Sequence, residues 1–221
     1  LFRSQVALRA GGSSVGDAGA SACASGVAAL GTEPFALVGA SLGGLSALMA
    51  ACMGLEPAAL ILVDIVPKMS ASGVARIRGF MLANPHGFAS IEEAADAISA
   101  YYPERPRPKD LSGLNKNLRL QPDGRYYWHW DLRMMTDQRA DPAQLIAMLD
   151  AADWTDRVPT LLVRGMKSDI VDDDGVEDLR RRIPKLEIAD IRGAGHMVAG
   201  DKNDEFNGAV IEFLRRVMPP A

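Results

Sequence analysis

The sequence predicts an α/β fold, in which a mostly parallel central sheet is flanked by helices and a helical cap is inserted between strands. From Pro34 onward, short apolar runs alternate with helical patterns, as in successive βαβ units. Between Pro67 and Asp153 this alternation stops and helical patterns remain, which indicates an insertion. A chain of 221 residues is long enough for one domain with a hydrophobic core and such an insertion.

The first half of the predicted sheet is a strand–helix–strand unit. Residues 35–38 form a wholly apolar run closed by Gly39, and the helical pattern that follows covers 42–53 and ends at Gly54. A second apolar run at 59–63 predicts the next strand. Continuous apolar runs of this length are typical of parallel strands that are buried on both faces.

The second half of the sheet follows the insertion. Apolar runs predict strands over 160–163, entered through Pro159, and over 186–191, entered after Pro184. Between them, 175–183 has a helical pattern with acidic residues before its start and arginines at its end, which complements the helix dipole. A last helix is predicted over 204–217, with Asn203 as its N-cap.

The predicted domain organisation is a core of 1–67 and 154–221 with a helical cap of 68–153. Within the cap, helical patterns cover 72–82, 91–101 and 142–152, no strand is clear, and three prolines between 103 and 108 break the chain. Residues 1–26 are rich in glycine, alanine and serine, with one short apolar alternation. We expect them to form an edge strand and a loop, or to be the remainder of a truncated N-terminal part of the core.

Composition and charge exclude several classes of function. The formal net charge is −4 and there is no basic stripe, which argues against a nucleic-acid partner. No apolar run approaches the ~20 residues that span a bilayer, and no signal peptide is recognisable, so we expect a soluble cytoplasmic protein without a membrane partner. Two cysteines and three histidines lie in no metal-ligand spacing, so we expect neither metal nor cofactor. The sequence does not define an oligomeric state.

The strongest local signal is Gly39-Ala40-Ser41-Leu42-Gly43-Gly44, a G-x-S-x-G nucleophile elbow between an apolar run and a helical pattern. The sharp turn requires small residues on either side of the serine, and it aims the Leu42 N–H at the position of an oxyanion. This motif predicts Ser41 as a nucleophile. The alternative is a glycine-rich turn in which the serine only caps the helix.

A nucleophilic serine needs a histidine base that an acid holds in the right tautomer. His196 lies in a loop of small residues after the last predicted strand, and we assign it as the base. For the acid we favour Asp169, which follows the strand at 160–163, because it gives the chain order Ser, Asp, His. Asp64 is the rival, since a carboxylate at the end of a parallel strand faces the ligand crevice of the sheet.

The sequence from Pro34 to the C-terminus resembles the α/β-hydrolase superfamily, in the capped branch of serine esterases, lactonases and perhydrolase-like enzymes. The stretches that carry the resemblance are GASLGG around Ser41, LILVDIVP at 60–67, LLVRGMKSDIV at 161–171 and GAGHMVAGDKND at 193–204. The resemblance implies acyl transfer through an acyl-serine intermediate. Serine at position 41 argues against epoxide hydrolases and haloalkane dehalogenases, which carry aspartate there.

The function that we expect is hydrolysis of small carboxylic esters, thioesters or lactones, with a small ester-like molecule as the binding partner. One alternative is a perhydrolase or cofactor-free haloperoxidase-like activity. Another is a catalytically impaired hydrolase or a non-catalytic ligand-binding domain. The family places its second oxyanion donor in a His-Gly type loop upstream of the nucleophile, and no histidine occurs among the 40 residues before Ser41. Either another N–H replaces it, or activity is impaired.

An aromatic stretch in the cap predicts a substrate pocket. Residues 125–131 include Tyr127, Trp128 and Trp130, and aromatic side chains over a nucleophile form an apolar pocket for an acyl or alcohol group. The alternative is that these side chains only attach the cap to the core. His129 lies between the two tryptophans, and His86 lies in a polar turn where we expect it to be solvated.

Overall fold

The computed structural model describes residues 33–130 and 142–219, together with Ser21, Cys23, Ser25, Gly26 and Ala28. The chain divides into two compact units, one of Leu1–Val74 with Gln138–Ala221 and one of Ala75–Asp137. The predicted N-terminal strand and the expected truncation lie outside the described residues. The predicted core and cap boundaries at 67 and 154 stay a prediction.

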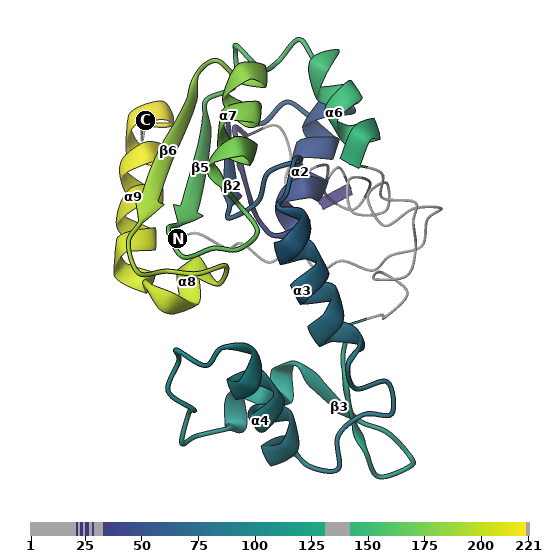
Figure 1. The fold of residues 1–221 in the computed structure, drawn as a ribbon. Helices are drawn as coiled ribbons and strands as arrows, with labels where there is room; N and C mark the ends of the chain where they lie inside the picture. The colour runs from purple at the N-terminus through teal and green to yellow at the C-terminus, as the bar shows by residue number, and fades with distance from the viewer. Residues whose placement is uncertain are drawn as a thin grey trace. The chain divides into compact units, whose positions relative to one another are not determined.

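The first unit contains a four-stranded parallel sheet (Figure 1). Its strands are β1 (Ala36–Ala40), β2 (Ala59–Val63), β5 (Thr160–Gly165) and β6 (Leu186–Ile191), in the spatial order β1-β2-β5-β6. All three pairings are parallel, so the carboxyl ends of the strands meet at one edge of the sheet. This confirms the α/β fold with a parallel central sheet, and it places the residues that follow each strand close together.

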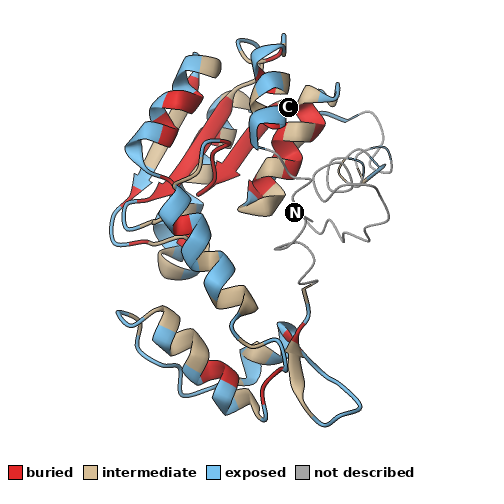
Figure 2. Ribbon diagram, turned by 45° about the vertical axis from the view of Figure 1, so that its right-hand side comes forward, coloured by how far each residue is buried: buried red, intermediate tan, exposed pale blue. Residues whose placement is uncertain are grey.

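Helices cover the sheet because its strands are apolar on both faces. Alternate residues of β2 and β5 form one hydrophobic cluster with Phe213 of α9 (Asn203–Val217). Figure 1 shows α9 on one face of the sheet and α7 (Asp173–Arg182) on the other. Every residue of β2 and β5 is buried, as Figure 2 shows for the strands at the centre of this unit.

The helices of the first unit begin and end near the predicted positions. α2 covers Leu42–Cys52 and is followed by Gly54, whose φ of 98° suits the end of a helix. Asp172 caps α7 through a hydrogen bond from the Gly175 N–H. The predicted N-cap at Asn203 is wrong: α9 starts at Asn203, and its N-cap is Lys202, because the short helix α8 (Val198–Asp201) ends immediately before it. α6 covers Pro142–Asp150.

The second unit has its own hydrophobic core. Phe88, Leu118 and Trp128 are buried in one cluster with Ala94 of α4 (Ile91–Tyr101). Ser90 caps α4 by accepting the Glu93 N–H. α3 (Ala71–Leu82) runs across the boundary between the two units. A 3-10 helix, η1, covers Ser112–Lys116.

The expectation that 68–153 contains no strand is wrong. β3 (Leu118–Leu120) and β4 (Tyr126–Trp128) form an antiparallel hairpin. The turn between them has Gly124 at φ 78°, with its N–H bonded to the Gln121 carbonyl. Each strand has three residues, too few to produce a period-two pattern, although a Pro-Asp-Gly turn followed by aromatic residues is a hairpin signal.

No helix within the described ranges is both long and apolar enough to cross a membrane.

Candidate active site

Ser41 lies in a strained turn between β1 and α2. Its backbone has φ 50° and ψ −125°, which serine rarely adopts, and its N–H donates to the Val63 carbonyl across the sheet. The turn depends on close backbone approach: a Cβ at Gly39 would lie 2.4 Å from the Gly43 carbonyl oxygen. One at Gly44 would lie 2.4 Å from the side chain of Ile65. This is the geometry that the G-x-S-x-G motif predicts.

The Ser41 side chain does not cap α2, since it makes no capping hydrogen bond. Its Oγ instead lies 3.1 Å from Nε2 of His196, which stands in the loop between β6 and α8. The structure therefore brings the predicted nucleophile and the predicted base together. Gly195 shapes this loop by donating its N–H to the Asp201 carboxylate.

Leu42 is the first residue of α2. The first N–H groups of a helix have no acceptor within the helix, and they lie at its positive end. Leu42 directly follows Ser41 in the chain. Its N–H is therefore close to the predicted nucleophile, where the proposed oxyanion donor is expected. The family's second oxyanion donor is expected upstream of the nucleophile. Almost all residues before 33 lie outside the described part of the chain.

The acid beside His196 is Asp64 and not Asp169, which corrects the favoured assignment. Nδ1 of His196 lies 2.8 Å from Oδ2 of Asp64, whose side chain is 0% exposed. Asp64 directly follows β2, the neighbour of β1, so its carboxylate reaches the strand end where Ser41 lies. Asp169 stands in the turn after β5, and its main-chain carbonyl packs against Gly73 of α3. Asp64 and Asp169 both lie between Ser41 and His196 in the sequence. The chain order Ser, Asp, His therefore does not distinguish the two candidate acids.

The Asp64 carboxylate accepts hydrogen bonds from the turn after β5. Oδ1 accepts the Gly165 N–H at 2.9 Å, and Oδ2 accepts the Ser168 hydroxyl at 2.5 Å. A buried carboxylate is stable when donors surround it, so these bonds compensate for the loss of water. Ser168 was not recognised in the sequence. Its signal was weak: a hydroxyl residue just past the end of a buried strand.

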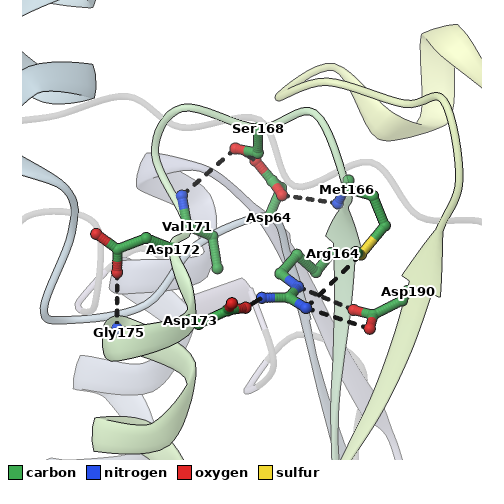
Figure 3. A network of polar contacts seen from close by, with 10 residues as sticks. Asp64, Arg164, Met166, Ser168, Val171, Asp172, Asp173, Gly175 and Asp190 are labelled. Atoms are coloured by element: carbon green, nitrogen blue, oxygen red, sulfur yellow. Dashed lines mark hydrogen bonds and ion pairs between the residues drawn. The ribbon is translucent and has the colours of Figure 1, made fainter.

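A second polar network holds the same turn in place (Figure 3). Arg164 of β5 forms a bidentate pair with Asp190 of β6, at 2.8 and 3.2 Å, and contacts Asp173 of α7 at 2.5 Å. The hydrogen bonds that Arg164 donates to Asp190, and then to Asp173, raise the pKa of Arg164 above its ordinary value. This arginine joins two strands and a helix directly beside Gly165, which positions the turn that carries Ser168.

The predicted pocket residues Tyr127, Trp128 and Trp130 all belong to the second unit and line one cavity of about 650 Å³. The two indoles stack with their ring centroids 4.5 Å apart, and Asp123, also lining the cavity, accepts the Tyr127 hydroxyl. The assignment of this cavity to the substrate stays a prediction. His86 and His129 are exposed. Among the described residues, no group of three histidine, cysteine or acidic side chains could hold a metal ion.

Comparison with known proteins agrees with this geometry. A family model described as "Alpha/beta hydrolase family" matches residues 8–209. The chain belongs to the α/β hydrolase family. Membership of the family agrees with the parallel central sheet flanked by helices.

Curated relatives of this α/β hydrolase include lipases. The chain is 27% identical over 195 residues to the sn-1-specific diacylglycerol lipase ABHD11 of Mus musculus, matching 84% of this chain and 60% of that protein. It is 29% identical over 193 residues to lipase LipV of Mycobacterium tuberculosis, matching 86% of this chain and 72% of that protein. The chain thus spans about three fifths of the mouse lipase's length.

Solved structures give the same fold. An esterase of Mycobacterium tuberculosis superimposes with a TM-score of 0.70 at 29% identity, covering 94% of this chain and 70% of that one. The crystal structure of E-2-(acetamidomethylene)succinate hydrolase superimposes with a TM-score of 0.75 at 20% identity, covering 92% and 75%. At that lower identity the likeness concerns the fold alone.

Proposed function

We propose that this α/β hydrolase is a serine hydrolase that cleaves small carboxylic esters, thioesters or lactones through an acyl-serine intermediate. The observation that carries the proposal is the continuous contact from Ser41 Oγ to His196 Nε2 at 3.1 Å and from His196 Nδ1 to Asp64 Oδ2 at 2.8 Å. The lipase and esterase names among its relatives support the same class of reaction.

The reaction follows from these contacts. His196 Nε2 accepts the proton of Ser41 as Oγ attacks the carbonyl carbon, and the Leu42 N–H donates to the resulting oxyanion. The imidazolium then gives the proton to the leaving alcohol or thiol as the carbon–leaving-group bond breaks. A water molecule, deprotonated by His196, attacks the acyl-serine and releases the acid. Asp64 accepts the hydrogen bond from Nδ1 of His196 and stabilises the imidazolium.

The test is hydrolysis of p-nitrophenyl butyrate together with labelling by a fluorophosphonate probe. We expect the wild-type chain to react with the probe at Ser41, and Ser41→Ala to lower kcat by about 10⁶-fold. We also expect kcat/KM to fall below about pH 6–7, as a histidine base becomes protonated. A wild-type chain that neither hydrolyses the ester nor binds the probe contradicts the proposal. Peroxide-dependent bromination in acetate, in place of hydrolysis, indicates the perhydrolase alternative.

A separate proposal is that the aromatic cavity of the second unit binds an apolar group of a small ester-like molecule. Its support is its composition, since stacked indoles and amide side chains are typical of small-molecule pockets. We expect Trp130→Ala to raise KM for aromatic esters more than for acetate esters. An equal effect on both, or none, contradicts this assignment and leaves the serine mechanism unaffected.

A further inference from the structure

Ser168 links the turn after β5 to the carboxylate that His196 contacts. Its Oγ lies 2.5 Å from Oδ2 of Asp64, the same oxygen that faces His196 Nδ1. The same Oγ accepts the N–H groups of Ile170 at 3.1 Å and Val171 at 3.4 Å. Figure 3 shows this hydroxyl between the backbone of the turn and Asp64. Ser168 therefore belongs to the site by contact, although it does not reach the reacting atoms.

The hydrogen-bonding capacity of a serine hydroxyl fixes the direction of each bond. It has one proton and two acceptor lone pairs, and the two backbone N–H groups occupy the acceptors. The proton must then point at Asp64 Oδ2. An ionised carboxylate only accepts, so His196 Nδ1 must also donate to that oxygen. Nε2 is left without a proton and can accept the proton of Ser41.

We propose that Ser168 is a positioning residue, whose hydroxyl fixes Asp64 Oδ2 against His196 and tempers the negative charge that this oxygen presents to the imidazole. The proposal rests on the proposed serine-hydrolase function. Without the hydroxyl, the buried carboxylate loses one of its donors and stabilises the imidazolium more strongly. We then expect His196 to hold its proton to a higher pH than in wild type, because the Gly165 N–H still holds Oδ1 and keeps the carboxylate beside the imidazole.

The competing explanation is that Ser168 only forms the turn, in which case its loss lowers stability and nothing else. Neutral substitutions of Ser168 distinguish the positioning role from a role in forming the turn alone, because they leave every charge around His196 in place. Within the described part of the chain, several charged residues besides Asp64 stand on the elements around the histidine loop. They are Arg164 on β5, Lys167 and Asp169 in the turn after it, Glu187 and Asp190 on β6, Arg192, Asp201 and Lys202 in and beside the loop, and Asp204 and Glu205 at the start of α9. Their effects on His196 are common to wild type and variants and cancel in the comparison.

The experiment compares wild type with Ser168→Ala, Ser168→Thr and Ser90→Ala. Ser90→Ala is the matched control, since it removes a hydroxyl that accepts a backbone N–H at the start of α4. The first measurement is the titration midpoint of the His196 imidazole by ¹⁵N NMR, which needs no substrate. We expect the midpoint to rise by about one pH unit in Ser168→Ala, the effect of one hydrogen bond to a charged group. Ser168→Thr, which keeps the hydroxyl, and Ser90→Ala should match wild type.

The second measurement is the pH profile of p-nitrophenyl butyrate hydrolysis, normalised to the amount of probe-reactive Ser41. We expect the acid limb of kcat/KM to move upward with the imidazole midpoint in Ser168→Ala. kcat should fall about two- to fivefold at pH 7, and about tenfold well below the midpoint, while KM changes little, because the hydroxyl acts on the base and not on bound substrate. If Ser168→Ala does not fold, Ser168→Cys has nearly the same size, and its weaker S–H donor should give a smaller shift in the same direction.

The outcomes separate this inference from the proposed function. An unmoved midpoint in both Ser168→Ala and Ser168→Cys, or one that moves equally in Ser90→Ala, overturns the role of Ser168. An active wild type with an unmoved midpoint leaves the serine mechanism intact. A midpoint that rises in a chain that neither hydrolyses the ester nor binds the probe supports the link from Ser168 to His196 and contradicts the hydrolase function.

Discussion

Two non-glycine residues in the described part of the chain have positive φ, and both stand at the ends of neighbouring strands. Ser41 has φ 50° after β1, and Asp64 has φ 48° after β2. Backbone of this kind costs about 1–3 kcal/mol and persists where surrounding contacts hold it. Here the Ser41 N–H bonds Val63, and the Asp64 N–H bonds Val163, at 3.1 and 2.8 Å. The strain places a hydroxyl and a carboxylate on either side of one imidazole.

The two candidate acids can be compared directly by matched aspartate-to-asparagine substitutions. We expect Asp64→Asn to lower kcat by about 10⁴-fold, because an amide cannot hold His196 in the tautomer that accepts the serine proton. Asp169→Asn should keep a rate close to wild type, since the ring nitrogens of His196 contact Asp64 and Ser41. Steady-state hydrolysis of p-nitrophenyl butyrate by both variants measures this. The reverse ranking would restore Asp169 as the acid.

At the scale of elements, the two glycines of G-x-S-x-G differ in what they do. Gly39 is the penultimate residue of β1 and lies against the first turn of α2, where a Cβ would meet the Gly43 oxygen at 2.4 Å. Among the residues that the structure describes, a Cβ on Gly43 itself meets nothing within 4 Å. The requirement for a small residue on the helical side falls instead on Gly44, which packs on Ile65. Two positions therefore require glycine because backbone or side-chain atoms lie too close for a Cβ. They are Gly39, the first glycine of the motif, and Gly44, the residue that follows the motif.

We expect alanine at position 39 and alanine at position 43 to change the free energy of unfolding in opposite directions. Gly39→Ala should lower the free energy of unfolding by about 2–3 kcal/mol, since backbone must move to admit the methyl group. Gly43→Ala should raise it by up to about 1 kcal/mol, because alanine is a better helix former and the space is open. Urea unfolding followed by circular dichroism gives both values. A loss at both positions of similar size would contradict the separation of their roles.

At the scale of the whole molecule, short apolar runs after turn residues predicted all four strands of the parallel sheet, most clearly the central strand β2, which is apolar and buried throughout. The edge strand β6, which contains Glu187 and Asp190, was predicted from its position after Pro184. The β3–β4 hairpin was missed since each of its strands has three residues. The acid was misassigned for a different reason. Asp64 is the first residue after β2, which pairs with the strand that leads to Ser41, whereas Asp169 lies four residues beyond the end of β5. Both positions are compatible with the chain order Ser, Asp, His, so the sequence pattern did not separate them.

The free energy of unfolding at low pH is a property of the whole molecule. We expect it to depend on the ion pairs of one buried carboxylate, Asp178. Asp178 of α7 is 7% exposed, and it contacts Arg182 at 2.7 Å and Arg181 at 2.9 Å. Burial raises the pKa of Asp178, but the hydrogen bonds and charges of the two arginines outweigh it and lower the pKa below its ordinary value. A carboxyl with a lowered pKa stabilises the fold above its ordinary titration range, and that stabilisation is lost as the pH falls through the lowered value.

Asp178→Asn should therefore lower the free energy of unfolding by about 2 kcal/mol at pH 7, since Arg182 loses its buried carboxylate partner and keeps only the half-exposed Asp150. The difference from wild type should shrink as the pH falls below about 4, where the unfolded carboxyl is protonated, and vanish once the folded carboxyl is protonated too. Asp174→Asn on the same helix is the matched control, because Asp174 is 72% exposed and its pair with Lys68 is screened by water. Urea unfolding at pH 7 and pH 3 measures both variants. A loss in Asp178→Asn that is the same at the two pH values would contradict the ion pair as its cause and indicate packing in its place.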